Sequence, residues 1–272
     1  WAIAQAGNRG VAAKLLTDFI NDFPKDPRIC EALTLRGDMY AKTKKEAEAL
    51  MDFDRVIARW PKAESAAAAW QRAAQIYAGR QDMANMAKYY EGLIQNFPKA
   101  SPAALAEAHF LLGRAAFDQG DFKSSISHMA EAKTLDPQKY GEQVNVLSVL
   151  SYHKLQDMNK LKEALETLQK ENPSAVARVP DVIPAWLGLQ AYGMKDLETA
   201  DKYMTWATQN DQLQNVKKVI WRNLAKVRLA LRKYDRALVA SNNFLKDEDQ
   251  PYRRADGMLD KASILLGLGK YA

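Results

Sequence analysis

Apolar residues recur three or four positions apart along most of this chain, as at Leu93, Ile94 and Phe97. This spacing places them on one face of an α-helix and leaves the other face polar. The pattern predicts consecutive pairs of amphipathic helices, among them 28–42 with 44–58 and 66–78 with 83–95. The chain has no convincing strands, so we expect an all-α protein with almost no sheet.

A tripeptide of an aromatic residue, proline and lysine separates the helix pairs at a fixed period. It occurs at Phe23-Pro24-Lys25, Trp60-Pro61-Lys62 and Phe97-Pro98-Lys99, with 37 residues from one proline to the next. Each proline marks the end of a helical hairpin, because proline lacks the N–H group and the φ freedom to continue a helix. Pro137 and Pro173 continue the series at intervals of 39 and 36 residues. Such a period is typical of an α-solenoid of stacked hairpins.

This register divides residues 1–272 into units of one solenoid. The units cover about 1–27, 28–64, 65–101, 102–138, 139–176, 177–213 and 214–250, with a partial unit at 251–272. The chain then starts within a first helix at Trp1 and stops near Ala272, where a second helix would begin. We therefore expect about seven hairpins truncated at both ends, as in a fragment, a processed form or a piece of a longer chain.

Residues at fixed places in these units resemble the tetratricopeptide repeat family. The unit at 102–138 matches best, with Leu112-Gly113 in the first helix, Gly120-Asp121-Phe122 at the turn, Ala132 in the second helix and Pro137 after it. The resemblance implies a right-handed superhelix whose first helices line a concave face, and a role in holding other proteins. Matching residues elsewhere are Gly37, Tyr40, Ala49, Trp70, Tyr77, Leu187-Gly188, Ala200, Ala207, Trp221, Leu224, Tyr234 and Ala237.

The segment Phe97-Pro98-Lys99-Ala100-Ser101 is similar to a Tyr-Pro-x-Ser element of certain bacterial envelope repeat proteins. That subgroup includes the outer-membrane assembly lipoprotein BamD and the TolA-binding periplasmic coordinator. The resemblance implies a periplasmic or envelope-associated location in preference to the cytoplasm. The unit at 139–176 departs from the family pattern, since it keeps Tyr152 but lacks the Leu-Gly pair.

Composition agrees with a folded helical protein and adds one feature, an uneven charge. Of the 272 residues, 47% are hydrophobic and 26% charged, and the net charge is +6. Between Leu213 and Ala240 the basic residues exceed the acidic ones by about seven. No apolar run approaches the length of a membrane span. The lone Cys30 forms no internal disulfide, and we expect it to be a small buried hydrophobe.

The sequence gives no support for catalysis or for a cofactor. It contains no nucleophile elbow, no phosphate-binding loop and no dinucleotide fingerprint. His109, His128 and His153 have neither the spacing nor the cysteine neighbours of a zinc motif. We therefore expect a protein that is not an enzyme and that has no metal and no cofactor.

Outward positions of the first helices are the candidate partner-binding residues. Side chains three and four apart form one stripe on each helix, and such stripes would hold an extended or helical peptide, with Arg114 and His153 fixing its orientation. Alternatively, a tightly wound superhelix buries the same residues as core. The stripe residues are Phe110, Arg114 and Phe117, then Val146, Leu150 and His153, then Ala185, Leu189 and Tyr192.

Arg222 and Lys226 lie four apart on one helix face and form a candidate cationic patch. They predict an acidic peptide as partner, or less readily phosphate groups or a membrane surface. Alternatively they belong to a solvated face that Asp247, Glu248, Asp249 and their neighbours balance. Nucleic acid is an unlikely partner, because exposed aromatic residues do not alternate with the basic ones over several units. Family members that bind chaperone C-termini hold the terminal carboxylate with a Lys/Asn clamp. The corresponding positions here are Thr34, Asp38, Gln71 and Gln75, so binding of a chaperone tail is disfavoured.

These observations predict a non-enzymatic scaffold that binds a partner protein or peptide, chiefly through its fourth to seventh units. The alternatives are a structural segment of a larger envelope assembly and the repeat region of a multidomain protein whose enzymatic part lies elsewhere. The sequence determines neither the identity of the partner nor the oligomeric state.

Overall fold

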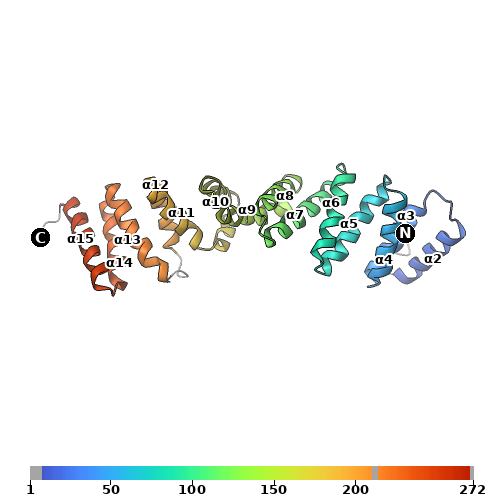
Figure 1. The fold of residues 1–272 in the computed structure, drawn as a ribbon, viewed down its shortest axis with the longest axis horizontal. Helices are drawn as coiled ribbons and strands as arrows, with labels where there is room; N and C mark the ends of the chain where they lie inside the picture. Colours follow the sequence, from blue (N-terminus) through green and yellow to red (C-terminus); the bar gives the residue numbers. More distant parts are fainter. Residues whose placement is uncertain (1–7, 210–213, 270–272) are drawn as a thin grey trace. The chain divides into compact units, whose positions relative to one another are not determined.

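A computed structural model describes residues 8–209 and 214–269 (Figure 1). Within these ranges the chain forms fourteen α-helices and one short 3-10 helix, and it contains no strand. The all-α prediction is confirmed. The truncations expected at Trp1 and Ala272 lie outside the described residues.

The helices alternate as first and second members of hairpins, and those predicted from 28 to 95 agree with the structure within two residues at each end. A second-type helix, α2 (Arg9–Asp22), precedes the first complete hairpin. The hairpins are α3 (Ile29–Lys42) with α4 (Glu46–Arg59), α5 (Glu64–Gly79) with α6 (Met83–Asn96), α7 (Pro102–Asp118) with α8 (Phe122–Leu135), α9 (Pro137–Lys154) with α10 (Met158–Glu171), α11 (Val182–Gly193) with α12 (Leu197–Ala207), and α13 (Gln214–Ala230) with α14 (Tyr234–Asp247). The 3-10 helix η1 (Pro173–Arg178) precedes α11, and α15 (Pro251–Gly267) follows the last hairpin.

The chain divides into two compact units, unit 1 at 1–147 and unit 2 at 148–272, with the boundary inside α9. In unit 1 each helix from α2 to α8 packs against the next, and α3 also contacts α5. In unit 2 the same order runs from α10 to α15, and the first helices α11 and α13 contact α13 and α15 respectively. This stacking of consecutive hairpins is an all-α solenoid arrangement. The single array over 1–272 and its right-handed superhelix stay predictions.

The aromatic-proline pairs end helices, as the sequence predicts. Phe23, Trp60 and Phe97 are the C-caps of α2, α4 and α6, and each backbone N–H still donates to the carbonyl four residues before it. The proline that follows disfavours the helical conformation of the cap residue and ends the helix there. Pro137 and Pro173 differ, because each begins the next helix.

Each of these hairpin turns contains one residue with positive φ. Counting back from that residue identifies equivalent positions on all the first helices, and we call this numbering the common register. A residue other than glycine adopts this conformation at five of these turns. The turn residues are Lys44, Gln81, Gly120, Gln156, Lys195 and Arg232. The positions ten residues before them are Thr34, Gln71, Phe110, Val146, Ala185 and Arg222.

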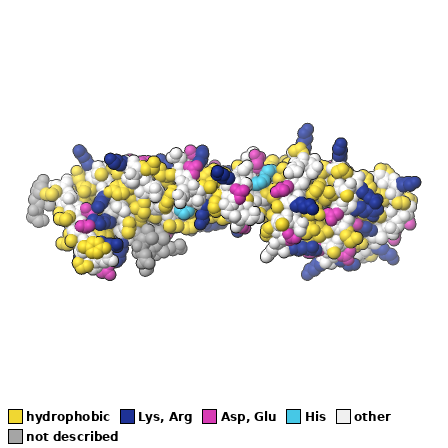
Figure 2. All heavy atoms as spheres, in the orientation of Figure 1, with side chains coloured by type: hydrophobic (Ala, Val, Ile, Leu, Met, Phe, Trp, Pro, Cys, Tyr) yellow, Lys and Arg dark blue, Asp and Glu magenta, His cyan; other side chains and the backbone are white. Residues whose placement is uncertain are grey.

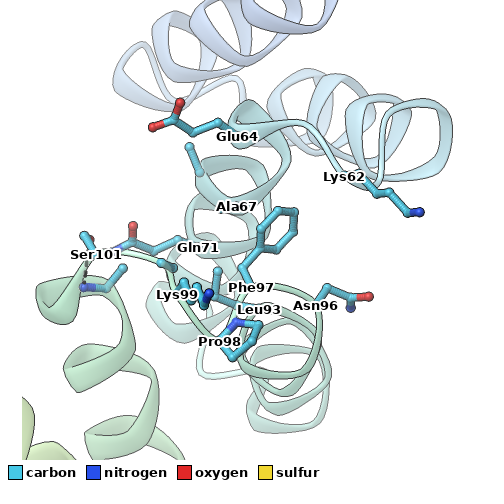
Figure 3. A pocket seen from close by; sticks show the side chains of 13 residues that line it. Lys62, Glu64, Ala67, Gln71, Leu93, Asn96, Phe97, Pro98, Lys99 and Ser101 are labelled. Carbon is cyan, nitrogen blue, oxygen red and sulfur yellow. Dashed lines mark hydrogen bonds between the residues drawn. The ribbon is translucent and has the colours of Figure 1, made fainter.

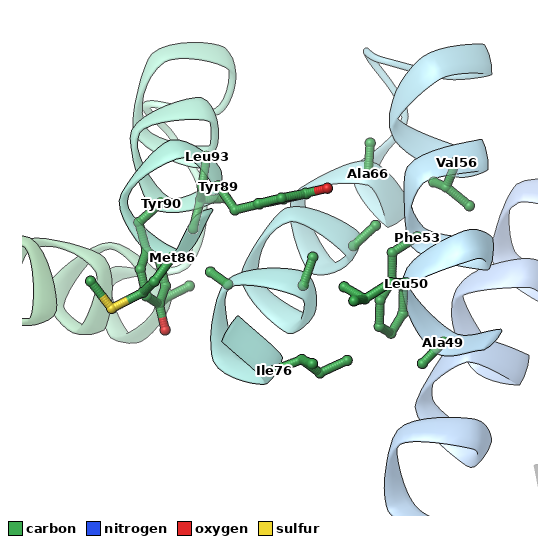
Figure 4. Packing of buried hydrophobic residues seen from close by; sticks show 14 of the residues in the cluster. Ala49, Leu50, Phe53, Val56, Ala66, Ile76, Met86, Tyr89, Tyr90 and Leu93 are labelled. Atoms are coloured by element: carbon green, nitrogen blue, oxygen red, sulfur yellow. The ribbon is translucent and has the colours of Figure 1, made fainter. Parts of the chain in front are cut away.

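The core of unit 1 forms where second helices cover the next first helix. Figure 4 shows α5 between α4 and α6, with Leu50 and Phe53 of α4 and Tyr89 of α6 directed toward it. The hydroxyl of Tyr89 reaches α4 and donates to Asp54. Cys30 is partly buried against the same core, in keeping with its predicted role.

Candidate partner-binding surface

On α7 the predicted stripe stays at the surface, but its aromatic residues pack against neighbours within unit 1. Phe110 is half-buried and stacks on Tyr140 of α9, with ring centroids 4.6 Å apart. Phe117 meets the edge of Phe122 across the hairpin turn, at 5.5 Å. Arg114 is exposed and pairs along its own helix with Asp118, at 3.3 Å. Substitutions at the two phenylalanines would therefore affect packing as well as any bound partner.

On α5 a polar network occupies the positions that correspond to the predicted stripes, and its hydrogen bonds link α5 to α6 and α7. The side-chain amides of Gln71 and Gln75 donate to the carboxylate of Glu107 at 2.7 and 2.8 Å, and the hydroxyl of Tyr90 donates to it at 3.2 Å. Burial and the charge of Glu107 raise the pKa of Tyr90. Sequence reasoning missed Glu107, although its distance of 36 residues from Gln71 is close to one repeat and marks the two as neighbours on successive first helices.

Unit 1 also contains an open cleft of about 610 Å³ beside the loop that begins at Phe97-Pro98 (Figure 3). Ala67 and Gln71 of α5 line it together with Leu93 of α6 and the C-cap residue Phe97, and Ser101 lies at the start of α7. The small alanines of α5 leave the space, and Gln71 connects the cleft to the Glu107 network. The sequence analysis assigned the aromatic-proline segments to helix ends alone and missed this cleft.

The stripe on α9 falls on both sides of the unit boundary. Val146 belongs to unit 1, whereas Leu150 and His153 belong to unit 2, and all three are half-buried. His153 makes an edge contact with Trp186 of α11, with ring centroids 5.5 Å apart. Burial, assisted by the charge of Lys154, lowers the pKa of His153, so the imidazole is neutral at pH 7.

On α11 the predicted stripe contains one buried and two half-buried residues, and the buried one, Ala185, is not a surface residue as predicted. Ala185 is only 1% exposed and belongs to the core, because α11 packs closely on α12 and α13 at this point. Leu189 and Tyr192 are half-buried at the edge of that core. One turn before Ala185, Val182 is 44% exposed and extends the stripe, although the sequence analysis did not select it.

The cationic patch at Arg222 and Lys226 is occupied by carboxylates of the next first helix. Arg222 lies 3.0 Å from Asp256 and 3.2 Å from Asp260 of α15, and Lys226 lies 3.8 Å from Asp260. Burial lowers the pKa of Arg222, but its bonds to Asp260 and Asp256 outweigh that effect and raise it. The acids that balance Arg222 and Lys226 are therefore on α15, whereas Asp249 lies 3.4 Å from Lys218, and the side chain of Asp247 lies outside the described residues.

The rest of the basic stretch is paired in a similar way within unit 2. Arg228 is buried and donates to Asp201 of α12 at 2.8 Å. Lys233 lies 2.8 Å from Glu198 and 3.0 Å from Asp201. Several of the basic side chains between Leu213 and Ala240 thus form ion pairs with acidic side chains on α12 and α15. Side chains at 214–217 lie outside the described residues.

Apolar side chains also remain on the surface of α13 and α15. Val219 of α13 is 47% exposed and stands 37 residues after Val182, at the same place in the register. On α15, Leu259 and Leu266 are 70% and 60% exposed. Figure 2 shows apolar side chains in yellow among the charged ones on the face that it draws. We define the first-helix surface of unit 2 as the exposed side chains Val182, Val219, Leu259 and Leu266 together with the half-buried Leu189 and Tyr192.

Two patterns are absent from the part of the chain that the structure describes. Over 8–209 and 214–269, no three or more His, Cys, Asp or Glu side chains are grouped so as to hold a metal ion. In the same ranges, the helices lack the combination of length and apolar character that a membrane span needs.

Comparison with known proteins identifies repeats in unit 1. Family models described as tetratricopeptide repeat match residues 31–63, 68–100 and 103–140. No curated protein sequence matches the chain significantly. The similarity to the envelope subgroup is not shown by these comparisons and stays a prediction.

Solved structures of low sequence identity are also similar to this chain. A chain in the structure of Naa15/Naa10 bound to HypK-THB is 13% identical with a TM-score of 0.56, and the match covers 98% of this chain but 37% of that one. A tetratricopeptide repeat protein from Parabacteroides merdae is 12% identical with a TM-score of 0.48, covering 96% of this chain and 95% of that one. At such identities the likeness concerns the fold alone.

Proposed function

Because this chain belongs to the tetratricopeptide repeat family, we propose that it is a scaffold that holds a partner protein or peptide on the exposed side chains of its first helices. Repeats of this kind generally serve as protein-interaction scaffolds and not as catalysts. The residues proposed to contact the partner in unit 2 are those of the first-helix surface.

One observation carries the proposal: apolar side chains recur at the same register on successive first helices and stay exposed after the hairpins have packed. Val182 and Val219 are 44% and 47% exposed, and their helices α11 and α13 contact each other. Isolated exposed apolar residues are common, but a repeated row on neighbouring helices is typical of a binding surface. On α15, Leu259 is also exposed, but it stands at the register position of Ala185 and Arg222, ten residues before the positive-φ Gly269.

The partner's chemistry follows from the composition of that surface. Val182, Val219 and Leu259 favour apolar anchor residues, such as one face of an amphipathic helix or alternate side chains of an extended segment. An acidic partner at Arg222 and Lys226 would have to displace Asp256 and Asp260 from them. We therefore propose apolar contacts as the main source of affinity and assign the cationic pair a secondary role.

The experiment compares capture of partners by two matched variants. Val182→Glu on α11 and Val239→Glu on α14 change the same residue type at exposed positions, 44% and 57% accessible, on a first and a second helix. Burying a glutamate against an apolar anchor is costly, so Val182→Glu should weaken capture at least about tenfold, or 1.4 kcal/mol. Quantitative mass spectrometry of affinity-purified complexes measures this loss.

Val239→Glu should retain partners at the level of the unchanged chain, and both variants should keep their helical circular dichroism because neither valine is buried. Equal loss in the two variants would contradict the proposal. Retention of every partner by Val182→Glu would equally exclude the first-helix surface. In that case the alternatives, a structural segment of an assembly or the repeat region of a larger enzyme, would be favoured.

A further inference from the structure

Two imidazoles from neighbouring helices face each other inside the hairpin α7–α8. Nδ1 of His109 lies 3.0 Å from Nδ1 of His128, and both residues are half-buried. Gly113 stands one turn after His109, and a Cβ added there would lie 3.1 Å from Cβ of His128. The glycine therefore allows the close helix approach that brings the two rings together.

Both imidazoles are held in their neutral form. Burial, reinforced by the charge of His128, lowers the pKa of His109, and burial lowers the pKa of His128. In the contact shown, one Nδ1 carries a proton and donates it to the other Nδ1. If that proton moves to Nε2 of the same ring, both Nδ1 lone pairs become available without any net loss of protons.

The distance between the two nitrogens fits a chelated metal ion. Metal–imidazole bonds are about 2.1 Å long, so two nitrogens bound at a right angle are about 3.0 Å apart. Right-angled nitrogen donors suit the tetragonal geometry of Cu²⁺ and the octahedral geometry open to Ni²⁺. To bind one ion in this way, each lone pair must point roughly 45° away from the line between the two nitrogens, so both rings have to rotate out of the hydrogen-bonded arrangement.

Nearby carboxylates partly offset the effect of burial on the pair. Glu131 of α8 interacts electrostatically with both imidazoles, and Glu91 of α6 and Asp121 at the start of α8 act on His128. Each of these carboxylates raises the pKa of its imidazole, but burial outweighs them and the pKa of both residues is lowered overall. In the described ranges no third His, Cys, Asp or Glu joins the pair in one ligand group, so water would complete the coordination.

We propose that His109 and His128 form a two-histidine site for a divalent first-row transition-metal ion, with Cu²⁺ bound more tightly than Ni²⁺ or Zn²⁺. The ion links α7 to α8 and stabilises the hairpin. The site is independent of the first-helix surface of unit 2, so the proposed scaffold function neither requires nor excludes it.

Titration of the tag-free chain with Cu²⁺, followed by calorimetry and electron paramagnetic resonance, tests the site. We expect one tight equivalent, with nitrogen couplings from two equatorial imidazoles. His109→Gln and His128→Gln should each weaken it by roughly tenfold or more, because one imidazole cannot chelate. His153→Gln is the matched control, since His153 contacts Trp186 and lies outside the pair. Performing all titrations in a Cys30→Ser background removes the thiol as a competing ligand.

Three results would overturn the proposal. The first is unchanged affinity in both pair variants, and the second is an equal loss in His153→Gln. The third is a spectrum of the parent chain with a single coordinated imidazole. The spectrum requires no substitution, so it decides the question even if the pair variants fail to fold.

Discussion

Replacing Asp201 with alanine is expected to destabilise unit 2 by about 3 to 5 kcal/mol. The carboxylate of Asp201 accepts a bond from Nε of Arg228 at 2.8 Å, and both side chains are 9% exposed. Lys233 adds a second contact at 3.0 Å. Without Asp201 the guanidinium of Arg228 stays buried, and its remaining partners among the described residues are Thr205 and the carbonyl of Arg236. Urea unfolding followed by circular dichroism measures the loss.

The control for this prediction is an ion pair of the same unit at the surface. Glu166 and Lys202 lie 2.9 Å apart but are each about half exposed, so Glu166→Ala should cost less than about 1 kcal/mol. Combining Asp201→Ala with Arg228→Met should recover much of the stability, because no charge is then left buried. A cost for Asp201→Ala as small as that for Glu166→Ala would show that the buried pair is not formed.

The same carboxylate gives unit 2 an acid-sensitive step. Burial raises the pKa of Asp201, but the bonds from Arg228 and Lys233 outweigh burial and lower it overall. A carboxylate whose folded pKa lies below its unfolded value of about 3.9 stabilises the fold above that pH, and the stabilisation is lost as pH falls through the folded pKa. Below about pH 4, Asp201→Asn should therefore show a flatter decline of unfolding free energy than the parent chain.

Gly188→Ala is expected to cost about 1 to 3 kcal/mol, although alanine is the better helix former. The added Cβ would lie 2.7 Å from Cγ and 2.9 Å from the backbone nitrogen of Met204. Met204 is fully buried on α12, so relief requires movement of the α12 backbone. Thermal and urea unfolding of the variant measure the cost.

Gly193→Ala provides the matched control on the same helix. A Cβ at Gly193 would meet no atom within 4 Å, so this variant should be neutral or more stable by up to about 1 kcal/mol. If the two substitutions change the unfolding free energy in opposite directions, the loss at Gly188 comes from packing against α12 and not from helix propensity. Equal effects at both positions would contradict the close approach of α11 and α12.

The repeat period predicts the helices well because it reflects local constraints. A proline after an aromatic C-cap ends α2, α4 and α6, and the Leu-Gly pair at Gly188 marks the close contact with α12. These signals lie within one hairpin. No aromatic-proline segment marks the boundary between units 1 and 2 inside α9, so the sequence analysis did not predict this boundary.

Side-chain pairing was harder to predict because partners are separated by about one repeat or by one hairpin turn. Arg222 meets carboxylates 34 and 38 residues later, on the next first helix. His109 and His128 are 19 residues apart, across a turn, so a search for close sequence spacing did not join them. Ala185 shares its helix face with Leu189, yet the depth of packing against α12 and α13 decides that it is core.

Photo-crosslinking tests most directly the central claim that a partner binds the first-helix surface of unit 2. Benzoylphenylalanine placed singly at 182, 219 or 239 samples three exposed valine positions, two on first helices and one on a second helix. The account predicts that irradiation of the chain with its captured partner gives crosslinks from positions 182 and 219 and few from 239. Crosslinking from 239 with none from 182 or 219 would contradict it.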